Sequence, residues 1–461
     1  MRIETGTPID PSLFGFVSDG VFPPITAIST DSREIRPGDL FVALTGEKTD
    51  GAAYIGEALA YGASLVLSHE ASDDPRVLAV SDPLAVLTDA AARYAETIPH
   101  RTVGITGSYG KTTLRHHLTG ILSAALTVAY TKGNGNTDLA LALTLLSIPE
   151  KTRILVAELG MRGRGEISRL SRLIRPDVAA ITAIGSAHVG LLGSVDTIRE
   201  AKCEIADGIK PGGLLLFPAN DPALSERIGS LPVRSATVST DPAFHGDYAL
   251  KLLGVDGGRA TVTLASPVGT VEDVVLPGCD PPLISSAAFC FAVCETLGVS
   301  REITLSGLSR LSPPPLRRQT ETIGGVSVIL DCYNASPEPT ISALDSLSRY
   351  RTEGKRLFLL LGEMLELGDA APEYHRAVGR RAAGLFPEYL FCMGELASYY
   401  AEGAVDAGFP CENVGFYAPN ELARLVKEFK SRAKPGDLLY VKGSRALALE
   451  SVVPLLKQAE T

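Results

Sequence analysis

Residues 101–113, Arg-Thr-Val-Gly-Ile-Thr-Gly-Ser-Tyr-Gly-Lys-Thr-Thr, constrain the fold of this chain more than any other stretch. The pattern predicts a buried β-strand that runs into a glycine-rich loop and then into a helix. Gly107 and Gly110 let the loop turn its backbone N–H groups inward. Lys111 adds a positive charge, and Thr112 can place its hydroxyl on a Mg²⁺ ion. The stretch therefore predicts an α/β domain that binds the phosphates of a nucleoside triphosphate.

The loop departs from the strict form of this motif. The strict form has glycine five residues before Gly110, and that position is Ile105 here. A Gly-x-x-Gly-Lys-Thr string can also be an ordinary turn between a strand and a helix. The apolar strand before the loop and the helix after it favour a phosphate-binding loop of a shorter variant.

The length of the chain implies more than one domain. A chain of 461 residues is too long for one hydrophobic core, and the usual domain size suggests about three domains. The stiff string Ser312-Pro313-Pro314-Pro315 predicts a linker. We therefore expect an α/β fold in three parts. They are a small α/β domain at 1–98, a central α/β domain with the phosphate loop at 99–312, and a doubly wound, Rossmann-like domain at 313–461.

Composition and charge argue against several classes of protein. A net charge of −10 without a basic stripe argues against binding to nucleic acid. No apolar run reaches the roughly 18 residues of a membrane helix, and the first residues lack a basic-then-apolar leader. The seven cysteines include no Cys-x-x-Cys and lie mostly in apolar runs, which favours free thiols in a reducing compartment. We expect a cytoplasmic protein without a membrane-inserted segment.

Polar side chains follow the predicted strands of the central domain. Glu158 ends one strand, and ligands of open α/β sheets bind outside the carboxyl ends of the strands, so we expect it to hold Mg²⁺ near the phosphates. His188 follows the strand at 177–184, and Lys202 lies on a helix predicted at 198–209. By itself a lone histidine is more often a structural hydrogen-bonding residue, and a helical lysine is usually solvated.

Five strings then recur in order along the chain. They are Thr106-Gly-Ser-Tyr-Gly-Lys-Thr-Thr113, Glu158-Leu-Gly160, Asp331-Cys-Tyr-Asn-Ala335, Gly362-Glu-Met-Leu-Glu-Leu-Gly368 with His375, and Lys442-Gly-Ser-Arg445. Together they resemble the Mur ligases of bacterial peptidoglycan synthesis, over all three predicted domains. The last three strings resemble the branch that adds D-alanyl-D-alanine to UDP-N-acetylmuramoyl-tripeptide.

The resemblance implies an ATP site in the central domain. Asn220 corresponds to a residue that contacts adenine, and Asp331, with an arginine before it, to the contact with ribose and phosphate. We choose Arg318 over Arg317 for that arginine, because the family's Gly-Arg pair is here Arg317-Arg318. The residues implied for the nucleotide are Gly107, Ser108, Gly110, Lys111, Thr112, Thr113, Asn220, Arg318 and Asp331.

The resemblance also implies two Mg²⁺ ions. Thr112 and Glu158 would hold the first ion, and His188 corresponds to a ligand of the second. Lys202, in Ala-Lys-x-Glu, corresponds to the lysine that the family carbamylates, which turns a cation into an anionic ligand. The implied catalytic residues are Lys111, His188 and Lys202.

The resemblance further assigns two first-domain loops to the uridine nucleotide. The loops at 29–33 and 48–51 are rich in hydroxyls, charge and glycine, and each alone would be interpreted as a solvated turn. Ser32 and Arg33 are the candidates there. The other residues implied for the substrates are Asn134, Asn136, Tyr333, Asn334 and Lys442.

The chain departs from the family pattern at three places. The family's Gly-Asn-x-Asn-Asn-x-x-Gly loop has Ala140 where glycine is expected, and Ala52 stands where histidine often follows Asp-Gly. His188 is followed by Val189-Gly190 and not by the frequent Leu-Glu. These departures leave the ATP chemistry intact and the details of substrate binding open.

The implied activity is the ATP-dependent formation of an amide bond. ATP would convert the tripeptide carboxylate to an acyl phosphate, and the dipeptide amine would displace phosphate. No Ser-His-Asp or Cys-His arrangement is needed. The partners would be these small molecules, and we expect a monomer with hinges near residues 99 and 312.

Two other activities are compatible with a phosphate loop of this kind. The first is a related ligase with another amino acid, such as the lysine- or diaminopimelate-adding ligase or a folylpolyglutamate synthase. The strings at 331–335 and 362–368 argue against it, because those relatives have other residues at these strand ends. The second is a nucleotide-dependent switch without ligase activity, which would have no need of Lys202 at a second metal.

Overall fold

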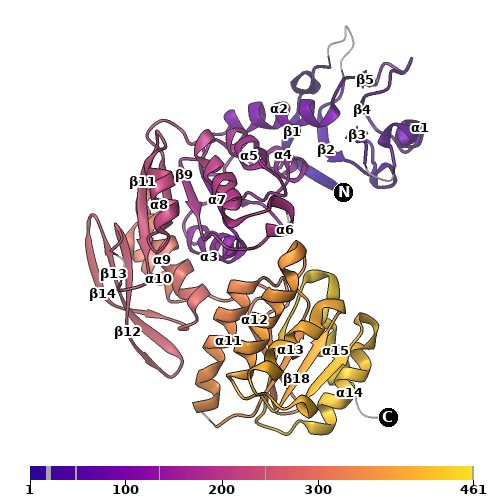
Figure 1. Ribbon diagram of the computed structural model, residues 1–461. Coiled ribbons are helices and arrows are strands. Elements are labelled where there is room, and N and C mark those ends of the chain that lie inside the picture. The colour runs from indigo at the N-terminus through magenta and orange to yellow at the C-terminus, as the bar shows by residue number, and fades with distance from the viewer. Residues whose placement is uncertain (17–21, 47–48, 134, 244, 353, 459–461) are drawn as a thin grey trace.

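The chain folds into three α/β domains that follow one another along the sequence (Figure 1). Each domain contains one β-sheet, of five, nine and six strands in turn. No helix among the described residues is long and apolar enough to cross a membrane. The structure is a computed structural model that describes residues 1–16, 22–46, 49–133, 135–243, 245–352 and 354–458.

The first domain is built on a sheet of order β1-β2-β3-β4-β5. The first two strands pair antiparallel and the others parallel. Its elements are β1 (Arg2–Ile9), β2 (Ile25–Ser29), β3 (Asp39–Val42), α1 (Ile55–Ala60), β4 (Leu65–Ser68), β5 (Val77–Ala79) and α2 (Pro83–Glu96).

The central domain is built on a sheet of order β14-β13-β12-β11-β10-β9-β6-β8-β7. Strands β6 to β11 are parallel, and the last three strands form an antiparallel extension at one edge. The strands are β6 (Arg101–Thr106), β7 (Val128–Tyr130), β8 (Ile154–Glu158), β9 (Val178–Ile181), β10 (Leu214–Pro218), β11 (Arg234–Ser239), β12 (Tyr248–Asp256), β13 (Arg259–Ser266) and β14 (Gly269–Leu276). The helices are α3 (Lys111–Ser123), α4 (Asp138–Leu146), α5 (Glu166–Ile174), α6 (Val189–Leu192), α7 (Val195–Cys203), α8 (Pro222–Gly229), α9 (Pro281–Thr296) and α10 (Arg301–Leu308).

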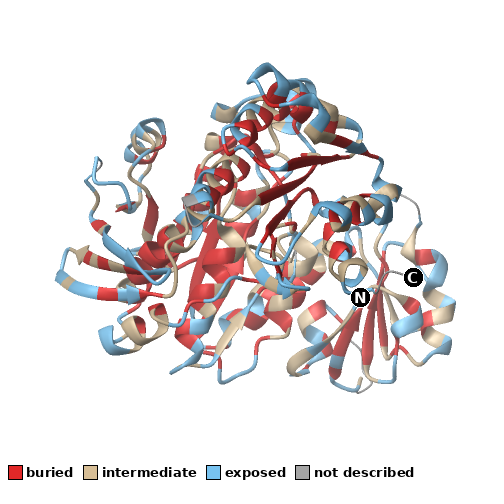
Figure 2. Cartoon of the chain, turned by 90° about the horizontal axis from the view of Figure 1, so that it is seen from below, coloured by how far each residue is buried: buried red, intermediate tan, exposed pale blue. Residues whose placement is uncertain are grey.

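The parallel strands of the central sheet are apolar on both faces because helices cover both faces. Helices α3 and α9 pack with one side of the sheet, and α4, α5 and α7 with the other. Strands β6, β8 and β9 are accordingly buried along almost their whole length, and Figure 2 shows buried strands in red at the centre of the molecule. Buried strands fix the positions of the loops at their carboxyl ends, where the phosphate loop begins.

The C-terminal domain is a doubly wound sheet of order β15-β16-β20-β17-β18-β19. Only β15 runs antiparallel to its neighbour, and cores lie on both faces. Its elements are β15 (Gln319–Ile323), β16 (Val326–Leu330), α11 (Pro337–Thr352), β17 (Leu357–Gly362), α12 (Ala371–Ala383), β18 (Tyr389–Met393), α13 (Ser398–Asp406), β19 (Val414–Tyr417), α14 (Leu422–Arg432), β20 (Leu438–Lys442) and α15 (Val452–Lys457). The Rossmann-like architecture expected for this part of the chain is confirmed, while the domain boundaries stay predictions.

The two domain junctions differ in chemistry. One hydrophobic core runs from the first domain into the central domain, and Tyr94 donates from its hydroxyl to the carbonyl of Ile148 at 3.0 Å. Gly6 lies so close to the same carbonyl that a Cβ would be 1.9 Å from its oxygen. The C-terminal domain instead meets the central domain through several polar contacts around a cavity. Polar interfaces of this kind come apart more readily than apolar ones.

A buried ion pair holds the first domain together, and it gives a stability prediction. Asp39 is fully buried and accepts two hydrogen bonds from the Arg2 guanidinium, at 2.7 and 2.9 Å. Asp39→Ala leaves Arg2 only its longer contact with exposed Glu4, at 3.8 Å, and is expected to lower the free energy of unfolding by about 3 kcal/mol. Urea unfolding measures this, with Arg76→Ala at the partly exposed pair with Asp74 as the control. Equal losses in the two variants would contradict the prediction.

Candidate active site

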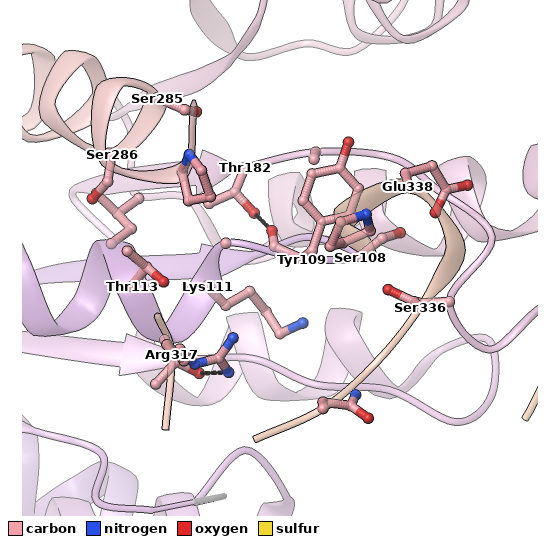
Figure 3. A pocket seen from close by; sticks show the side chains of 18 of the residues that line it. Ser108, Tyr109, Lys111, Thr113, Thr182, Ser285, Ser286, Arg317, Ser336 and Glu338 are labelled. Carbon is pink, nitrogen blue, oxygen red and sulfur yellow. Dashed lines mark hydrogen bonds between the residues drawn. The ribbon is translucent and has the colours of Figure 1, made fainter. Parts of the chain in front are cut away.

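A cavity of about 1470 Å³ lies between the central and C-terminal domains. One wall is the phosphate loop with the carboxyl ends of β6, β8 and β9, and the opposite wall is formed by the ends of β16, β17 and β20. In Figure 3 Lys111 of the central domain and Arg317 and Ser336 of the C-terminal domain point toward the same space. The two open sheets thus present their ligand-binding edges to each other.

The phosphate loop adopts the conformation that its glycines allow. Gly107 and Gly110 have φ of +148° and +84°, and a Cβ on Gly107 would lie 2.0 Å from the Thr182 hydroxyl oxygen. Thr182 donates to the backbone carbonyl of Tyr109, which ties the loop to the end of β9 (Figure 3). Ser108 donates from its hydroxyl to the carbonyl of Gly185 at 3.1 Å. Helix α3 then starts at Lys111, so its N-terminus points into the cavity.

Lys111 is a desolvated cation at the start of that helix. Its Nζ donates to the carbonyl of Gly107 at 2.5 Å. Burial lowers the pKa of Lys111 to about 8, the nearby Glu158 acts to raise it, and Arg317 lowers it further. A bound triphosphate would raise this pKa again, because an adjacent negative charge favours the protonated form.

The residues expected at the first metal form a compact cluster. Thr112 donates from its hydroxyl to Glu158 Oε2 at 3.1 Å, and Arg115 Nε donates to Glu158 Oε1 at 2.5 Å. Arg317 reaches from the C-terminal domain and donates to Thr112 Oγ1 at 3.0 Å. Buried Arg317 Nε has no hydrogen-bond partner among the described residues. The excess of cations over the single carboxylate suits an anionic ligand.

This donor set fits a Mg²⁺ ion that shares its ligands with phosphate. No group of three or more His, Cys, Asp or Glu side chains suited to a metal occurs in the described part of the chain. Mg²⁺ takes one or two protein oxygen ligands and completes its shell with water and phosphate oxygens. The hydroxyl of Thr112 and the carboxylate of Glu158 supply such oxygens.

His188 and Lys202 line the same cavity. His188 has φ of 69° and its Nδ1 is 2.6 Å from Glu366 Oε2 of the C-terminal domain. Lys202 is 2 % exposed, and burial together with the charge of Lys111 lowers its pKa well below the usual value. A lysine cation does not suit a metal, whereas a neutral amine can add CO₂ and become an anionic ligand. The pair therefore fits a metal only in the carbamylated form.

The helix that carries Lys202 is shorter than predicted. Helix α7 ends at Cys203, and residues 204–208 form a 3₁₀ turn. Gly208 packs against Ser171 so closely that a Cβ would lie 2.1 Å from the backbone oxygen of Ser171. The Glu204 carboxylate accepts from the backbone N–H groups at the start of α5. These contacts hold the turn against α5.

The C-terminal wall holds a second polar cluster. The Asp331 carboxylate accepts from the Tyr440 hydroxyl at 2.7 Å and from buried Lys442 Nζ at 2.9 Å. Lys442 Nζ also lies 3.4 Å from the carbonyl of Asn334. The Tyr333 ring lies under the Arg317 guanidinium, with 4.3 Å from its carbon to the ring centre. Asp331 and Lys442 neutralise each other and leave hydrogen-bonding groups at the cavity edge.

The cavity does not gather every residue that the sequence predicts. Arg318 lines it but pairs with Asp280 at 2.9 Å, whereas its neighbour Arg317 reaches Thr112. Thr113, Asn136 and Asn220 line the cavity as well. Asn134 lies outside the described residues.

Two predicted residues lie in the first domain, away from this cavity. Ser32 donates to Glu57 at 2.5 Å, and Arg33 pairs with Asp31 at 2.7 Å while 78 % of its side chain is exposed. Their assigned role with the uridine nucleotide stays a prediction.

Sequence reasoning did not assign roles to Arg115, Glu338 or Glu366. Arg115 lies one turn after Lys111 on α3, and this spacing indicates that the two side chains lie on the same face of the helix. Glu338, at the start of α11, and Glu366, in the loop after β17, contact the central domain from positions far away in the sequence, and no local pattern predicts such contacts.

Comparison with known proteins identifies the family. Three family models match in order: "Mur ligase family, catalytic domain" at residues 24–101, "Mur ligase middle domain" at 105–263, and "Mur ligase, glutamate ligase domain" at 317–445. A curated relative, the UDP-N-acetylmuramoyl-tripeptide–D-alanyl-D-alanine ligase of Bacillus subtilis (strain 168), is 33 % identical over 93 % of this chain and 92 % of its own.

Solved structures support the same family. A crystal structure of MurF from Acinetobacter baumannii superposes with a TM-score of 0.87 at 27 % identity, over 99 % of this chain and 100 % of that one. MurF ligase from Thermotoga maritima in complex with ADP gives a TM-score of 0.83 at 27 % identity, over 93 % and 96 %. The matches span the phosphate loop, both walls of the cavity and the first domain, and this chain belongs to the Mur ligase family.

Proposed function

We propose that the chain is an ATP-dependent ligase that joins D-alanyl-D-alanine to UDP-N-acetylmuramoyl-tripeptide. The observation that carries this proposal is the cavity between two sheets, with a phosphate loop on one wall and the strings at 331–335, 362–368 and 442–445 at the other. The relatives named for this reaction match over nearly the whole chain. An ADP complex among the similar structures supports ATP as the nucleotide.

The phosphate loop binds the triphosphate. Its backbone N–H groups and the N-terminus of α3 point at the phosphates, and Lys111 neutralises charge on the phosphoryl group as it is transferred. Arg317 adds a second cation from the C-terminal wall. Asn220 and Asp331 are the proposed contacts to adenine and ribose, and Arg318 is the arginine proposed to contact the nucleotide beside Asp331.

Two Mg²⁺ ions, when bound, would screen the phosphates from the attacking carboxylate and stabilise charge on the transferring group. Thr112 and Glu158 would hold the first ion, and His188 with carbamylated Lys202 the second. The carbamate forms when the neutral amine adds to CO₂ and releases one proton. Burial favours this reaction, because it lowers the pKa of Lys202 and keeps its amine neutral.

Amide formation needs no nucleophilic side chain. The tripeptide carboxylate takes the terminal phosphoryl group of ATP, which gives an acyl phosphate and releases ADP. The dipeptide amine then attacks the acyl carbonyl, and loss of a proton and of phosphate leaves the amide. The two facing walls keep water from the acyl phosphate. Domain movement about the linkers near 99 and 312 would let substrates in and products out.

The substrate contacts are assigned by position. Tyr333, Asn334 and Lys442 on the C-terminal wall are proposed to face the dipeptide, and Asn136 the tripeptide. Ser32 and Arg33 are proposed to bind the uridine nucleotide. Asn134 is a further proposed substrate contact. We also propose that the enzyme is a monomer and works in the cytoplasm, where ATP is supplied.

The two alternatives make different predictions. A ligase with another amino acid would use the same central domain, and its distinguishing residues would lie on the C-terminal wall. A nucleotide switch would bind ATP but release no phosphate on addition of the substrates. The buried Lys202 next to His188 favours an enzyme.

One assay tests the proposed function. We expect phosphate release from ATP only when a UDP-linked muramoyl tripeptide and D-alanyl-D-alanine are both present, with single amino acids giving background rates. Mass spectrometry should then detect the corresponding pentapeptide product. Equal rates with D-alanine or another amino acid would contradict the dipeptide assignment, and no release under any condition would contradict ligase activity.

A further inference from the structure

One short segment of the central domain is held by two carboxylates of the C-terminal domain. Glu338, at the start of α11, accepts a hydrogen bond from the backbone N–H of Ser186 at 2.9 Å. Glu366, in the loop after β17, lies 2.6 Å from His188 Nδ1. Both contacts fall within five residues of one another on the central-domain segment 185–190. The C-terminal domain therefore contacts the segment that carries His188, one of the proposed metal ligands.

A pair of glycines brings the two domains this close. The backbone N–H of Gly190 donates to the carbonyl of Glu366 at 3.1 Å. A Cβ on Gly190 would lie 2.4 Å from the backbone nitrogen of Gly368, and one on Gly368 would lie 2.8 Å from the Gly190 Cα. Gly190 is the second residue of α6 and has no positive φ, so its small size matters for this contact and not for the backbone conformation. In Figure 1 α6 lies at the face of the central domain that is nearest to the C-terminal domain.

The contact between His188 and Glu366 sets the state of the imidazole ring. A carboxylate accepts hydrogen bonds, so Nδ1 carries the proton and donates it. The lone pair of the neutral ring is then on Nε2. Histidines that bind metals generally donate their other ring N–H to a carboxylate in this manner, which fixes the orientation of the ring and makes the free nitrogen more basic.

We propose that Glu366 is a positioning residue for His188, and that it can act only while Gly190 and Gly368 are in contact. Docking of the C-terminal domain then orients the ligand of the second metal, so that this half of the site forms only when the cavity is closed. The inference rests on the proposed function, because it takes His188 as a metal ligand. It adds a residue of the C-terminal domain to a site otherwise built from the central domain.

The simpler interpretation is that Glu366 only adds to the attraction between the domains. The side chains of His188 and Glu366 are 26 % and 40 % exposed, and exposed ion pairs contribute little to stability. If this were its whole role, removal of the Glu366 carboxylate would leave the tautomer of His188 and the affinity for the metal unchanged. These two quantities therefore separate the interpretations.

The experiment measures Mn²⁺ binding by electron paramagnetic resonance on the full-length protein with a non-hydrolysable ATP analogue. Glu366→Ala is expected to weaken the second Mn²⁺ site by about 10-fold to 100-fold. Glu366→Gln should restore most of the affinity, because its amide oxygen still accepts from Nδ1–H. Nitrogen NMR of His188 should show loss of the Nδ1–H tautomer in Glu366→Ala and its return in Glu366→Gln. Glu412→Ala, at an exposed carboxylate, is the control.

The glycine contact is tested in the same assay. Gly190→Ala should weaken the second Mn²⁺ site as Glu366→Ala does, and the double variant should be no worse than either single one, since both changes break the same link. Gly120→Ala on α3, where a Cβ would meet nothing within 4 Å, is the matched control. Small-angle scattering should show an opening in Gly190→Ala only.

Two results would overturn the inference: Mn²⁺ affinity and tautomer unchanged in Glu366→Ala, or fully additive losses in the double variant. Failure of the proposed function would appear differently, as wild-type protein that binds two Mn²⁺ ions but releases no phosphate with the proposed substrates.

Discussion

Lys111→Ala is expected to lower kcat by about 10³-fold, the largest loss that we predict for a single side chain. The phosphoryl group carries negative charge throughout its transfer, and Lys111 is the cation at the start of α3, within the loop that turns its N–H groups inward. Loss of a desolvated charge is not made good by water, because the C-terminal wall closes over the loop. Burial lowers the pKa of this lysine to about 8, and the bound phosphates would raise it again, which keeps the amine protonated during transfer.

The measurement is ADP formation at saturating substrates, with folding checked by circular dichroism. Lys151→Ala, at an exposed lysine in the turn before β8, is the control and should keep full activity. A Lys111→Ala variant with half of the wild-type rate would show that the transferred phosphoryl group lies elsewhere.

The same lysine gives a pH dependence. Because the folded-state pKa of Lys111 is about 8 and the ordinary value is 10.5, the unfolded chain binds more protons between these values. The nucleotide-free protein should therefore gain stability from this group as the pH rises through that window, and lose that contribution as the pH falls through about 8. Lys111→Met removes the effect, so the difference between the two unfolding curves isolates it. If the difference in the free energy of unfolding between wild type and Lys111→Met stayed constant from pH 8 to 10.5, the lowered pKa would be contradicted.

The local parts of the site could be predicted from the sequence. Gly107, Gly110 and Lys111 form one contiguous loop, so their spacing alone defines a phosphate-binding geometry. Glu158 ends a buried apolar strand, and the rule that ligands bind at the carboxyl ends of parallel strands places it next to that loop. These inferences succeed because each depends on neighbours in sequence or on one sheet edge.

The contacts between domains could not be predicted in this way. Arg317 and Arg318 are adjacent and alike in sequence, and the positive φ of Leu316 and Arg318 helps to decide which guanidinium reaches Thr112. Glu366 reaches His188 across 178 positions of the chain. The buried state of Lys202 likewise comes from packing around α7 and has no signature in its own helix. Such features depend on tertiary structure, which local patterns do not encode.

Lys202→Ala is expected to lower kcat by about 10²-fold or more, and small carboxylates such as formate or acetate should restore part of the loss. The proposed carbamate is an anion at the end of a long side chain, so removal of that chain leaves a space in which a free carboxylate can take its place. Lys202→Arg is the matched control. Its guanidinium fills the space and stays positive, so this variant should be inactive and should not respond to carboxylates.

The source of the negative charge can be tested on the wild-type protein as well. Removal of CO₂ from the buffer should slow the wild-type enzyme reversibly and leave the formate-restored Lys202→Ala unaffected, because only the former needs CO₂ to make its ligand. Full activity of Lys202→Ala without additive, or restoration by an alkylammonium ion in place of a carboxylate, would contradict the carbamate. Restoration by an alkylammonium ion would mean that the Lys202 side chain acts as a cation. Because Lys202 is 2 % exposed and lies near Lys111, that cation would need a phosphate oxygen to neutralise it. The low pKa that burial imposes argues for the neutral amine, and a neutral amine is the form that reacts with CO₂.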